Sequence, residues 1–241
     1  MITKETLENL FFPKNLTCLH CGCEINHNHS HSLCLKCFSN LPFNTHFCIH
    51  CGTPMHSKNE LCEFCQTQNR GFLIARSPFC FESPISNFVH GFKYENKQFL
   101  FKHMAAFMYA EFLKSKMQAD IVIPVPLSNQ RLKQRKYNQA TKLAQEFCKL
   151  SKIPLYENLV LRYQNTHTQT DLSWQQRQEN LKNAFKICNK TQQIVNNKKI
   201  LIVDDVFTTG ATTSNLAMLL QSGGAKQVSI LTLAHTDFKN K

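Results

Sequence analysis

The sequence ILIVDDVFTTGATT at residues 200–213 combines two adjacent carboxylates with a loop rich in hydroxyl groups. A glycine in this loop, Gly210, allows backbone N–H groups to curve around a group of oxygens. A helix starting near Thr213 would direct its positive end into the same place. Four side chains add neutral hydrogen-bond donors: Thr208, Thr209, Thr212 and Thr213. Such a loop suits a phosphate monoester.

The carboxylates beside this loop, Asp204 and Asp205, suggest that the ligand is not phosphate alone. Carboxylates accept hydrogen bonds from sugar hydroxyls, or hold Mg²⁺ directly or through water. A phosphorylated ribose offers both features. An apolar strand ending in Asp-Asp also occurs in nucleotide hydrolases and phosphoacceptor domains. A P-loop is excluded, because it needs Gly-Lys-Ser/Thr and no glycine of this sequence precedes a lysine.

Eight of the twelve cysteines form four C-x-x-C pairs, and this spacing is typical of a metal site. The pairs are Cys18/Cys21, Cys34/Cys37, Cys48/Cys51 and Cys62/Cys65. Two cysteines three residues apart suit a tight knuckle, and two knuckles supply one tetrahedral site. Four thiolates leave no open position, which favours structural over catalytic zinc.

The pairs form an internal repeat, CLHCG with CLKC and then CIHCG with CEFC. The repeat favours ligation by neighbouring pairs, although an interleaved arrangement, one zinc rather than two, and disulfides or free thiols remain alternatives. The other cysteines, Cys23, Cys80, Cys148 and Cys188, are expected to be buried thiols. The histidines His27, His29 and His31 are expected to be solvated in the first inter-knuckle loop, and an extra metal site is the alternative.

The charge of the chain is concentrated in its C-terminal part. Residues 1–75 hold five basic and five acidic side chains, so the whole excess of +12 lies in residues 76–241. A short, neutral, cysteine-rich segment cannot bury much apolar surface and needs metal for stability. We therefore expect a zinc-ribbon-type domain over 1–70 and a basic α/β domain over 71–241, which would attract a polyanion.

Alternating strands and helices are expected to position the Asp-Asp and threonine residues. Apolar periodicity predicts helices at 99–117, 138–150 and 214–224, and buried strands at 120–127, 198–205 and 228–234. This order predicts a mostly parallel sheet with helices on both faces. Ligands bind at the carboxyl ends of the strands in such sheets, where Asp204 and Asp205 lie.

Neither a leader peptide nor a membrane span is expected. The N-terminal MITKETLENLFFPKN has no apolar core, and charged residues interrupt the apolar window at 99–117. We expect a cytoplasmic protein.

The segment 200–213 resembles the phosphoribosyl pyrophosphate signature of type I phosphoribosyltransferases. Further segments make nearly the whole chain similar to the ComF family of bacterial competence proteins. They are the cysteine-rich N-terminus, HGFKYENK at 90–97, IPVPL at 123–127, RKYNQATKLA at 135–144 and LRYQNTHTQTDLSWQQRQENLKNAF at 161–185.

This resemblance implies that Asp204 and Asp205 are catalytic-site residues that bind the ribose hydroxyls. It assigns the 5-phosphate to Thr208, Thr209, Gly210, Ala211 and Thr212. It identifies the loop after IPVP as the pyrophosphate loop, with cations at Arg131, Lys133, Arg135 and Lys136. Lys136 occupies a position where the family usually has glycine. It also implies site-bordering roles for Arg162, Gln169, Arg177 and Asn180, and either a site or a surface role for Lys93.

The implied chemistry is attack on C1 of the activated ribose as Mg²⁺-bound pyrophosphate leaves, with an acceptor that the sequence does not identify. The implied function is a competence protein that handles incoming single-stranded DNA and contacts other DNA-uptake or helicase proteins. Two alternatives remain: a metabolic nucleobase phosphoribosyltransferase, and a zinc-ribbon scaffold that docks on uptake proteins and keeps a vestigial ligand site.

Overall fold

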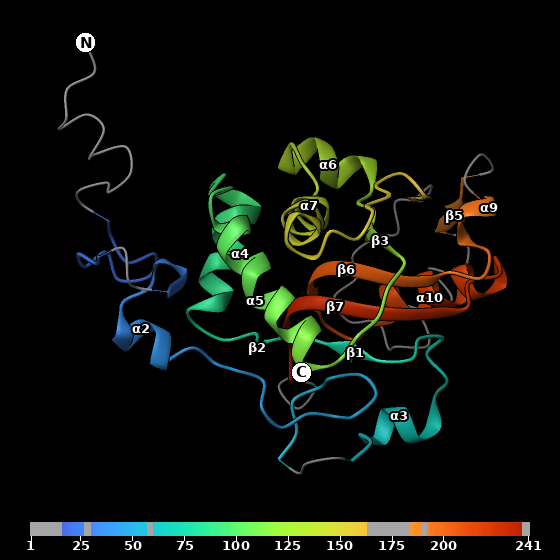
Figure 1. Ribbon diagram of the computed structural model, residues 1–241, viewed down its shortest axis with the longest axis horizontal. Helices are drawn as coiled ribbons and strands as arrows, with labels where there is room; N and C mark the ends of the chain where they lie inside the picture. Colours follow the sequence, from blue (N-terminus) through green and yellow to red (C-terminus); the bar gives the residue numbers. More distant parts are fainter. Residues whose placement is uncertain (1–15, 27–29, 57–59, 163–183, 189–191, 238–241) are drawn as a thin grey trace. The chain divides into compact units, whose positions relative to one another are not determined.

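The computed structural model describes residues 16–26, 30–56, 60–162, 184–188 and 192–237 (Figure 1). The chain forms two compact units, Met1–Pro42 and Phe43–Lys241. The division expected from sequence at residue 70 follows the last cysteine motif, whereas this division follows packing. The second pair of cysteine motifs consequently belongs to the same unit as the α/β sheet.

The cysteine repeat of the sequence is a structural repeat. In the first copy, Cys18 N–H donates to the Cys23 carbonyl (2.8 Å) and Gly22 N–H to the Cys18 carbonyl (3.0 Å). The second copy repeats this turn, with Gly52 N–H donating to the Cys48 carbonyl at 2.9 Å. Gly22 and Gly52 have φ values of 74° and 75°, a left-handed conformation that glycine adopts without strain.

Each turn is followed by a short helix that begins at a cysteine. Helix α2 (Leu35–Ser39) has Cys34 as its N-cap, and α3 (Glu63–Thr67) has Cys62. The first unit also contains the 3-10 helix η1 (Ser30–Ser32). Helices this short are not stable alone, so they need other bonds, such as metal coordination by their cysteines, to hold them.

The second unit is built on a five-stranded parallel sheet. Its strand order is β1 (Ala75–Arg76), β7 (Gln227–His235), β6 (Lys199–Phe207) and β3 (Ile121–Pro124), and β2 (Phe79–Cys80) also pairs with β7. All of these pairings are parallel. The mostly parallel sheet expected from the sequence is therefore confirmed.

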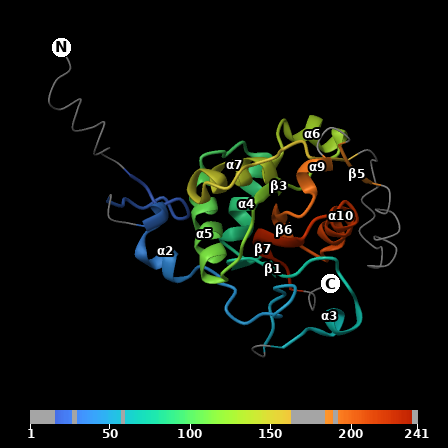
Figure 2. The same cartoon turned by 45° about the vertical axis from the view of Figure 1, so that its right-hand side comes forward.

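Helices cover both faces of this sheet, as the alternation of strands and helices predicted. Helices α4 (Ile85–Tyr94), α5 (Leu100–Lys114) and α7 (Gln139–Ser151) lie on one side, and α10 (Ala211–Ser222) lies on the other (Figure 2). Ile200 and Ile202 of β6 share a core with Leu216 of α10. The intervening Leu201 and Val203 are fully buried too, which explains why β6 is apolar at each position from 200 to 203 rather than at alternate ones.

Element boundaries differ from the expectation at the functional end of the sheet. Strand β6 continues through Asp204 and Asp205 to Phe207, and α10 begins at Ala211 rather than near Thr213. The turn between them is therefore only three residues long, 208–210. Strand β3 ends at Pro124 rather than at 127 as expected, because the prolines of IPVP cannot donate to the sheet.

The remaining elements lie between β3 and β6 in the chain. They are α6 (Asn129–Arg135), the antiparallel pair β4 (Val160–Arg162) and β5 (Phe185–Ile187), and α9 (Gln192–Val195). Across the described ranges, no helix has both the length and the apolar character needed to span a bilayer.

Candidate functional site

A cavity of about 200 Å³ lies at the carboxyl ends of β3 and β6, where a parallel sheet places its ligand site. It brings together side chains from four separate segments. Its polar lining comprises Lys93, Arg131, Arg135, Asn138, Gln139, Arg162, Asp204, Asp205, Thr208, Thr212 and Thr213.

The turn at 208–210 forms one end of this cavity. Gly210 is the N-cap of α10 and has a φ of 72°. Thr208, Gly210 and Thr212 line the cavity, whereas Thr209 and Ala211 are not part of the described lining. The Thr209 hydroxyl instead accepts a hydrogen bond from Ala211 N–H at 3.4 Å. The turn thus presents the amino end of a twelve-residue helix and two threonine side chains to a ligand.

The two aspartates differ in their surroundings. Asp205 is buried and its Oδ2 accepts from Lys93 Nζ at 2.7 Å, while its backbone N–H donates to Asp204 Oδ1 at 2.8 Å. Burial, and secondly the neighbouring Asp205 carboxylate, raises the pKa of Asp204 to about 7. The pair therefore holds a proton more readily than two free carboxylates would.

Lys93 is placed in the site by the structure. The sequence left a surface role open, but the Lys93 ammonium pairs with Asp205 and lines the cavity. It extends from the last turn of α4, a helix that is far from β6 in the sequence.

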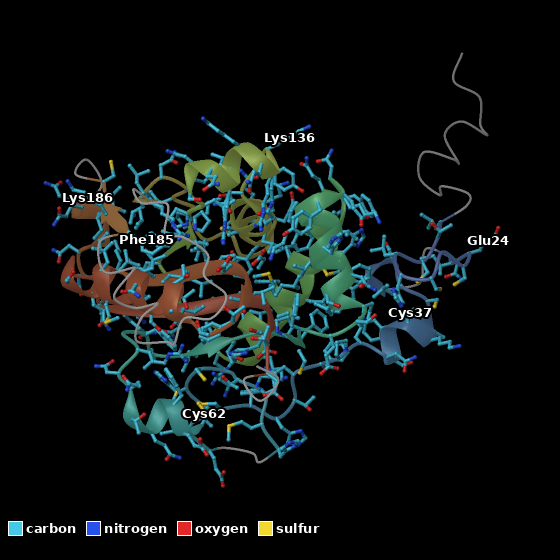
Figure 3. All side chains as sticks on the ribbon, turned by 180° about the vertical axis from the view of Figure 1, so that it is seen from behind. Glu24, Cys37, Cys62, Lys136, Phe185 and Lys186 are labelled. Atoms are coloured by element: carbon cyan, nitrogen blue, oxygen red, sulfur yellow. The ribbon has the colours of Figure 1, made fainter. Side chains whose placement is uncertain are left out.

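Helix α6 supplies cations from one face only. Arg131 and Arg135, one helical turn apart, line the cavity. Lys133 and Lys136 are exposed and are absent from the described lining. Lys136 ends the helix at the protein surface with a left-handed φ of 65°, the conformation for which glycine is usual (Figure 3).

The Tyr-Asn-Gln motif that follows α6 fixes this segment. The Tyr137 hydroxyl donates to the Phe92 carbonyl, and Asn138 Nδ2 donates to the Val125 carbonyl at 2.9 Å. Asn138 Oδ1 also accepts from Ala140 N–H at 3.0 Å, which caps α7. These bonds hold α6 against the end of β3.

Arg162 also lines the cavity, while Gln169, Arg177 and Asn180 lie outside the described residues.

A second cavity of about 430 Å³ adjoins the first. The two cavities share Lys93, Val206 and Thr208, and Pro54, Phe81, Glu82 and Asp237 are among the other residues that line the second. A ligand in the first cavity would therefore have space beside it for another molecule.

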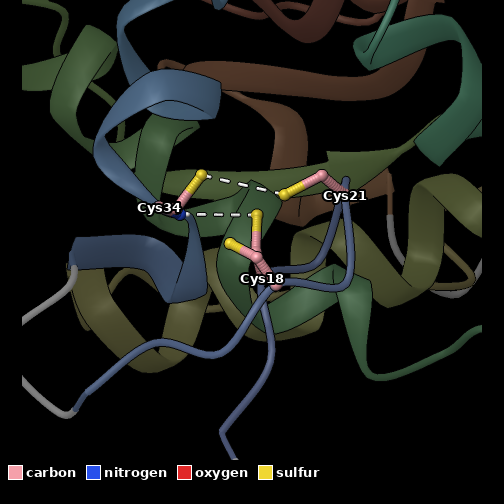
Figure 4. A group of neighbouring side chains, drawn as sticks. Cys18, Cys21 and Cys34 are labelled. Carbon is pink, nitrogen blue, oxygen red and sulfur yellow. Dashed lines mark hydrogen bonds between the residues drawn. The ribbon is translucent and has the colours of Figure 1, made fainter.

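The first cysteine group lies in the N-terminal unit. The sulfur atoms of Cys18, Cys21, Cys23 and Cys34 are all within 4.8 Å of one another. Cys21 Sγ lies 3.8 Å from Cys34 Sγ, and Cys34 N–H points to Cys18 Sγ at 3.4 Å (Figure 4). Tetrahedral zinc with Zn–S bonds of about 2.3 Å places sulfurs about 3.8 Å apart, so the geometry fits zinc.

Cys23 was expected to be an ordinary buried thiol, but it is exposed and belongs to this group. The expected ligand Cys37 is not in the four-sulfur set, although its thiol interacts with those of Cys18, Cys21 and Cys34. Five thiols therefore compete for four positions.

The other thiols expected to be buried, Cys80, Cys148 and Cys188, are half-buried. His31 stacks on Phe38, and His27 and His29 are outside the described residues.

The second group consists of Cys48, Cys51, Cys62 and Cys65, as predicted. Cys51 Sγ and Cys62 Sγ are 3.7 Å apart, and Cys62 N–H points to Cys48 Sγ at 3.4 Å. These distances also fit tetrahedral zinc with four thiolates and no open position. The sites consequently use neighbouring knuckles, and the interleaved arrangement is excluded.

The chain is similar in sequence to several known proteins. The family described as "Double zinc ribbon domain" matches residues 7–66. The chain is 30% identical over 213 residues to competence protein ComFC of Bacillus subtilis, with 83% of each chain covered. It is 29% identical over 225 residues to competence protein F of Haemophilus influenzae, covering 91% of this chain and 97% of that protein. It is also 27% identical over 209 residues to DNA utilization protein YhgH of Escherichia coli K12, covering 85% and 90%.

Solved structures are similar at a lower level. An allosteric regulatory enzyme of purine biosynthesis has 17% identity and a TM-score of 0.39, over 66% of this chain and 31% of that one. A hypoxanthine phosphoribosyltransferase from Staphylococcus aureus has 18% identity and a TM-score of 0.34, over 58% and 65%. The matched region thus spans less than two thirds of either structure.

The parallel sheet, the cavity at the carboxyl ends of its strands and the two cysteine groups define an α/β protein with a double zinc ribbon. Its likeness to the Bacillus protein extends over most of both chains. The chain belongs to the ComFC family of competence proteins.

Proposed function

We propose that the chain binds phosphoribosyl pyrophosphate with Mg²⁺ in the 200 Å³ cavity and that this site serves the handling of incoming single-stranded DNA during natural transformation. One observation carries the ligand assignment. A carboxylate pair, a helix amino terminus and two arginines line a single cavity, and these groups match the three chemical parts of that ligand.

Each part of the ligand has a complementary group. Asp204 and Asp205 accept hydrogen bonds from the ribose hydroxyls. The turn at 208–210 and the first residues of α10 bind the 5-phosphate through backbone N–H groups and the hydroxyls of Thr208 and Thr212. Arg131 and Arg135 extend toward the diphosphate, which planar guanidinium groups bind in a two-point contact.

Mg²⁺ would neutralise the diphosphate when bound, and the oxygen donors of the cavity suit such a cation. If the ligand reacts, an acceptor attacks C1 of the ribose, the C1–O bond breaks and pyrophosphate leaves with the bonding electrons. The residues of this chain would contribute by positioning and by charge neutralisation. The second cavity adjoins the ribose end through Lys93, which pairs with Asp205, and offers space for an acceptor.

The role in DNA handling is supported by the net positive charge of the α/β part and by similarity to proteins named for competence and DNA utilization. Residues 76–241 carry the whole excess of +12, and such a surface attracts a phosphate backbone. Relatives carry the names competence protein F, DNA utilization protein YhgH and competence protein ComFC. We propose cytoplasmic action, in contact with other DNA-uptake or helicase proteins.

Calorimetry on one purified sample tests the ligand assignment. Phosphoribosyl pyrophosphate with Mg²⁺ should bind the wild-type chain, and the double variant Asp204→Asn with Asp205→Asn should lose binding while keeping its circular dichroism spectrum. Unchanged affinity in the double variant would refute the assignment. Gel shifts with single-stranded DNA at rising salt test the second part, and binding that does not weaken with salt contradicts it.

A metabolic nucleobase phosphoribosyltransferase is the second candidate, and the adjoining cavity is the observation that favours it. It requires that one base, mixed with phosphoribosyl pyrophosphate and Mg²⁺, releases pyrophosphate. A panel of purine and pyrimidine bases that yields no pyrophosphate excludes this candidate and leaves the binding function intact.

A further inference from the structure

Arg70 is a fully buried cation that lies next to the turn at residues 208–210, the phosphate turn. Its side chain is 0% exposed, and none of the ion pairs found among the described residues includes it. The guanidinium carbon lies 5.1 Å from the ring centre of Phe64, 5.4 Å from that of Phe72 and 5.2 Å from that of Phe207. Aromatic faces offset part of the cost of burying a charge, but they do not neutralise it.

The Arg70 guanidinium contacts the turn directly. Its Nη2 donates to the Thr209 carbonyl, and its Nε donates to Ser214 Oγ at 3.4 Å. A Cβ on Gly210 would overlap Arg70 Nη2 and the Phe207 ring, so Gly210 is required by packing as well as by its φ. In a trans peptide the carbonyl and the next N–H point in opposite directions. Since Arg70 holds the Thr209 carbonyl, the Gly210 N–H is turned away from Arg70.

Arg70 also has an unused donor. Its Nη1 is buried and has no hydrogen-bond partner among the residues that the structure describes. A buried charged donor without a partner lowers the stability of the folded state, because its lost hydration is not replaced. Beside a turn that is built for phosphate, the uncompensated positive charge would stabilise a dianion.

The second cysteine group supports the aromatic side of Arg70. Phe64 lies in α3, between Cys62 and Cys65. His50 Nδ1 lies 3.3 Å from Cys65 Sγ, and His50 Nε2 lies 2.9 Å from the Phe72 carbonyl. The His50 ring also stacks on Phe72 at 4.9 Å. A continuous series of contacts therefore connects this metal site to the Thr209 carbonyl.

Helix α3 has only five residues, so metal bonds at Cys62 and Cys65 are what would hold Phe64 in place. The helix lies on the side of the sheet where β1 is the edge strand (Figures 1 and 2). Without metal, Phe64 and His50 lose their anchor, and Arg70 loses part of its aromatic enclosure.

We propose that Arg70 is a positioning residue through which the Cys48/Cys51/Cys62/Cys65 metal site sets the phosphate turn, so that metal loading of this site controls affinity for the 5-phosphate. The proposal rests on the proposed function for its ligand. The first cysteine group lies in the other unit.

The first test compares Cys62→Ser with a control variant of the first group in the full chain. The control is the double variant Cys18→Ser with Cys34→Ser, because five thiols surround the first site and four would remain after a single substitution. Each should lose one zinc per chain. Hydrogen exchange at residues 207–216 should rise in Cys62→Ser only, and affinity for ribose 5-phosphate should fall about tenfold in that variant only. Wild-type exchange in Cys62→Ser, or equal effects of the two variants, would overturn the proposal.

The second test keeps both metal sites and is not affected by misfolding of the ribbon. Arg70→Lys is compared with Arg76→Lys. Arg76 donates to the carbonyls of Ile49 and Ala75 and lies over Phe47, so it contacts the same knuckle but not the turn. Arg70→Lys should keep its zinc, raise exchange at 207–216 and weaken ribose 5-phosphate about tenfold, because an ammonium lacks the guanidinium fork. Arg76→Lys should do none of these.

A second ligand, Mg²⁺-pyrophosphate, shows whether Arg70→Lys affects only the phosphate turn or the whole cavity, because the arginines of α6 would hold this ligand. Arg70→Lys should leave its affinity unchanged, and an equal loss for both ligands would refute the positioning role. If wild-type protein binds neither ligand, the proposed function fails, and the exchange comparison still decides whether the metal site controls the turn. If ligands bind but exchange is the same in all variants, only the coupling fails.

Discussion

The Nζ atom of Lys93 lies 2.7 Å from Oδ2 of Asp205, with the two side chains 18% and 12% exposed. This pair joins the end of α4 to the end of β6 inside the ligand cavity. Because the pair is mostly withdrawn from water, removal of one partner leaves a charge that solvent compensates poorly.

Lys93→Met should therefore lower the free energy of unfolding by about 2 kcal/mol at pH 8. The loss should be smaller at pH 5, where the carboxyl pair can take up a proton. Urea denaturation at both pH values measures this difference. Lys97→Met is the matched control, because Lys97 pairs with Glu95 at 2.6 Å on the surface, with side chains 50% and 45% exposed. It should change stability by less than about 1 kcal/mol, and equal losses in both variants would contradict the prediction.

Asp204 should make stability depend on pH. Its pKa is raised from 3.8 to about 7, so between these values the folded chain binds a proton more tightly than the unfolded chain. The free energy of unfolding consequently falls as pH rises through that window. Asp204→Asn removes this contribution, and its stability relative to wild type should increase from pH 5 to pH 7 and then level off. A stability difference that is constant from pH 5 to pH 8 would show that the pKa is not raised.

The cavity-facing side of α6 should carry its affinity for pyrophosphate. Arg131→Gln and Arg135→Gln should each weaken Mg²⁺-pyrophosphate binding about tenfold, the loss expected for a charge-assisted hydrogen bond. Lys133→Gln removes the same charge from the exposed face and should change affinity less than about twofold. Calorimetry at constant ionic strength measures all three. Equal losses would mean that net charge, rather than the face of the helix, determines binding.

Lys136 should be a site of easy stabilisation. It ends α6 with a φ of 65°, where a side chain costs energy that glycine does not. Lys136→Gly should raise the free energy of unfolding by about 0.5–1 kcal/mol. In Lys133→Gly, by contrast, the glycine lies inside the helix and should lower it by about 1 kcal/mol. Urea denaturation of both variants is the measurement, and a loss of stability in Lys136→Gly would contradict the prediction.

Two zinc ions should leave the protein at different rates. Cys21 and Cys23 of the first group are exposed, whereas Cys48 and Cys51 of the second are fully buried. A chelator should therefore release one zinc per chain quickly and one slowly. The double variant Cys18→Ser with Cys34→Ser leaves three thiols at the first site and should abolish the fast phase alone, as a colorimetric zinc assay can show. A single phase in wild-type protein would mean that burial does not protect the second site.

The sequence by itself determined the features that depend on local pattern. Apolar runs predicted the strands around 200 and 230, since a strand buried on both faces is apolar at every position. Helical periodicity predicted α5 and α7 within a few residues. The spacing of the cysteine pairs predicted the knuckles, because one turn brings residues three apart to a common side.

Only the tertiary structure decided which distant residues meet. It selected Lys93 for Asp205, placed Arg131 and Arg135 but not Lys133 at the cavity, and added Cys23 to the first metal group. Arg70 had no distinguishing sequence signal, yet it is enclosed by three aromatic rings beneath the phosphate turn. Local periodicity records which face of an element is buried. It does not record which element covers that face, and these contacts depend on that second fact.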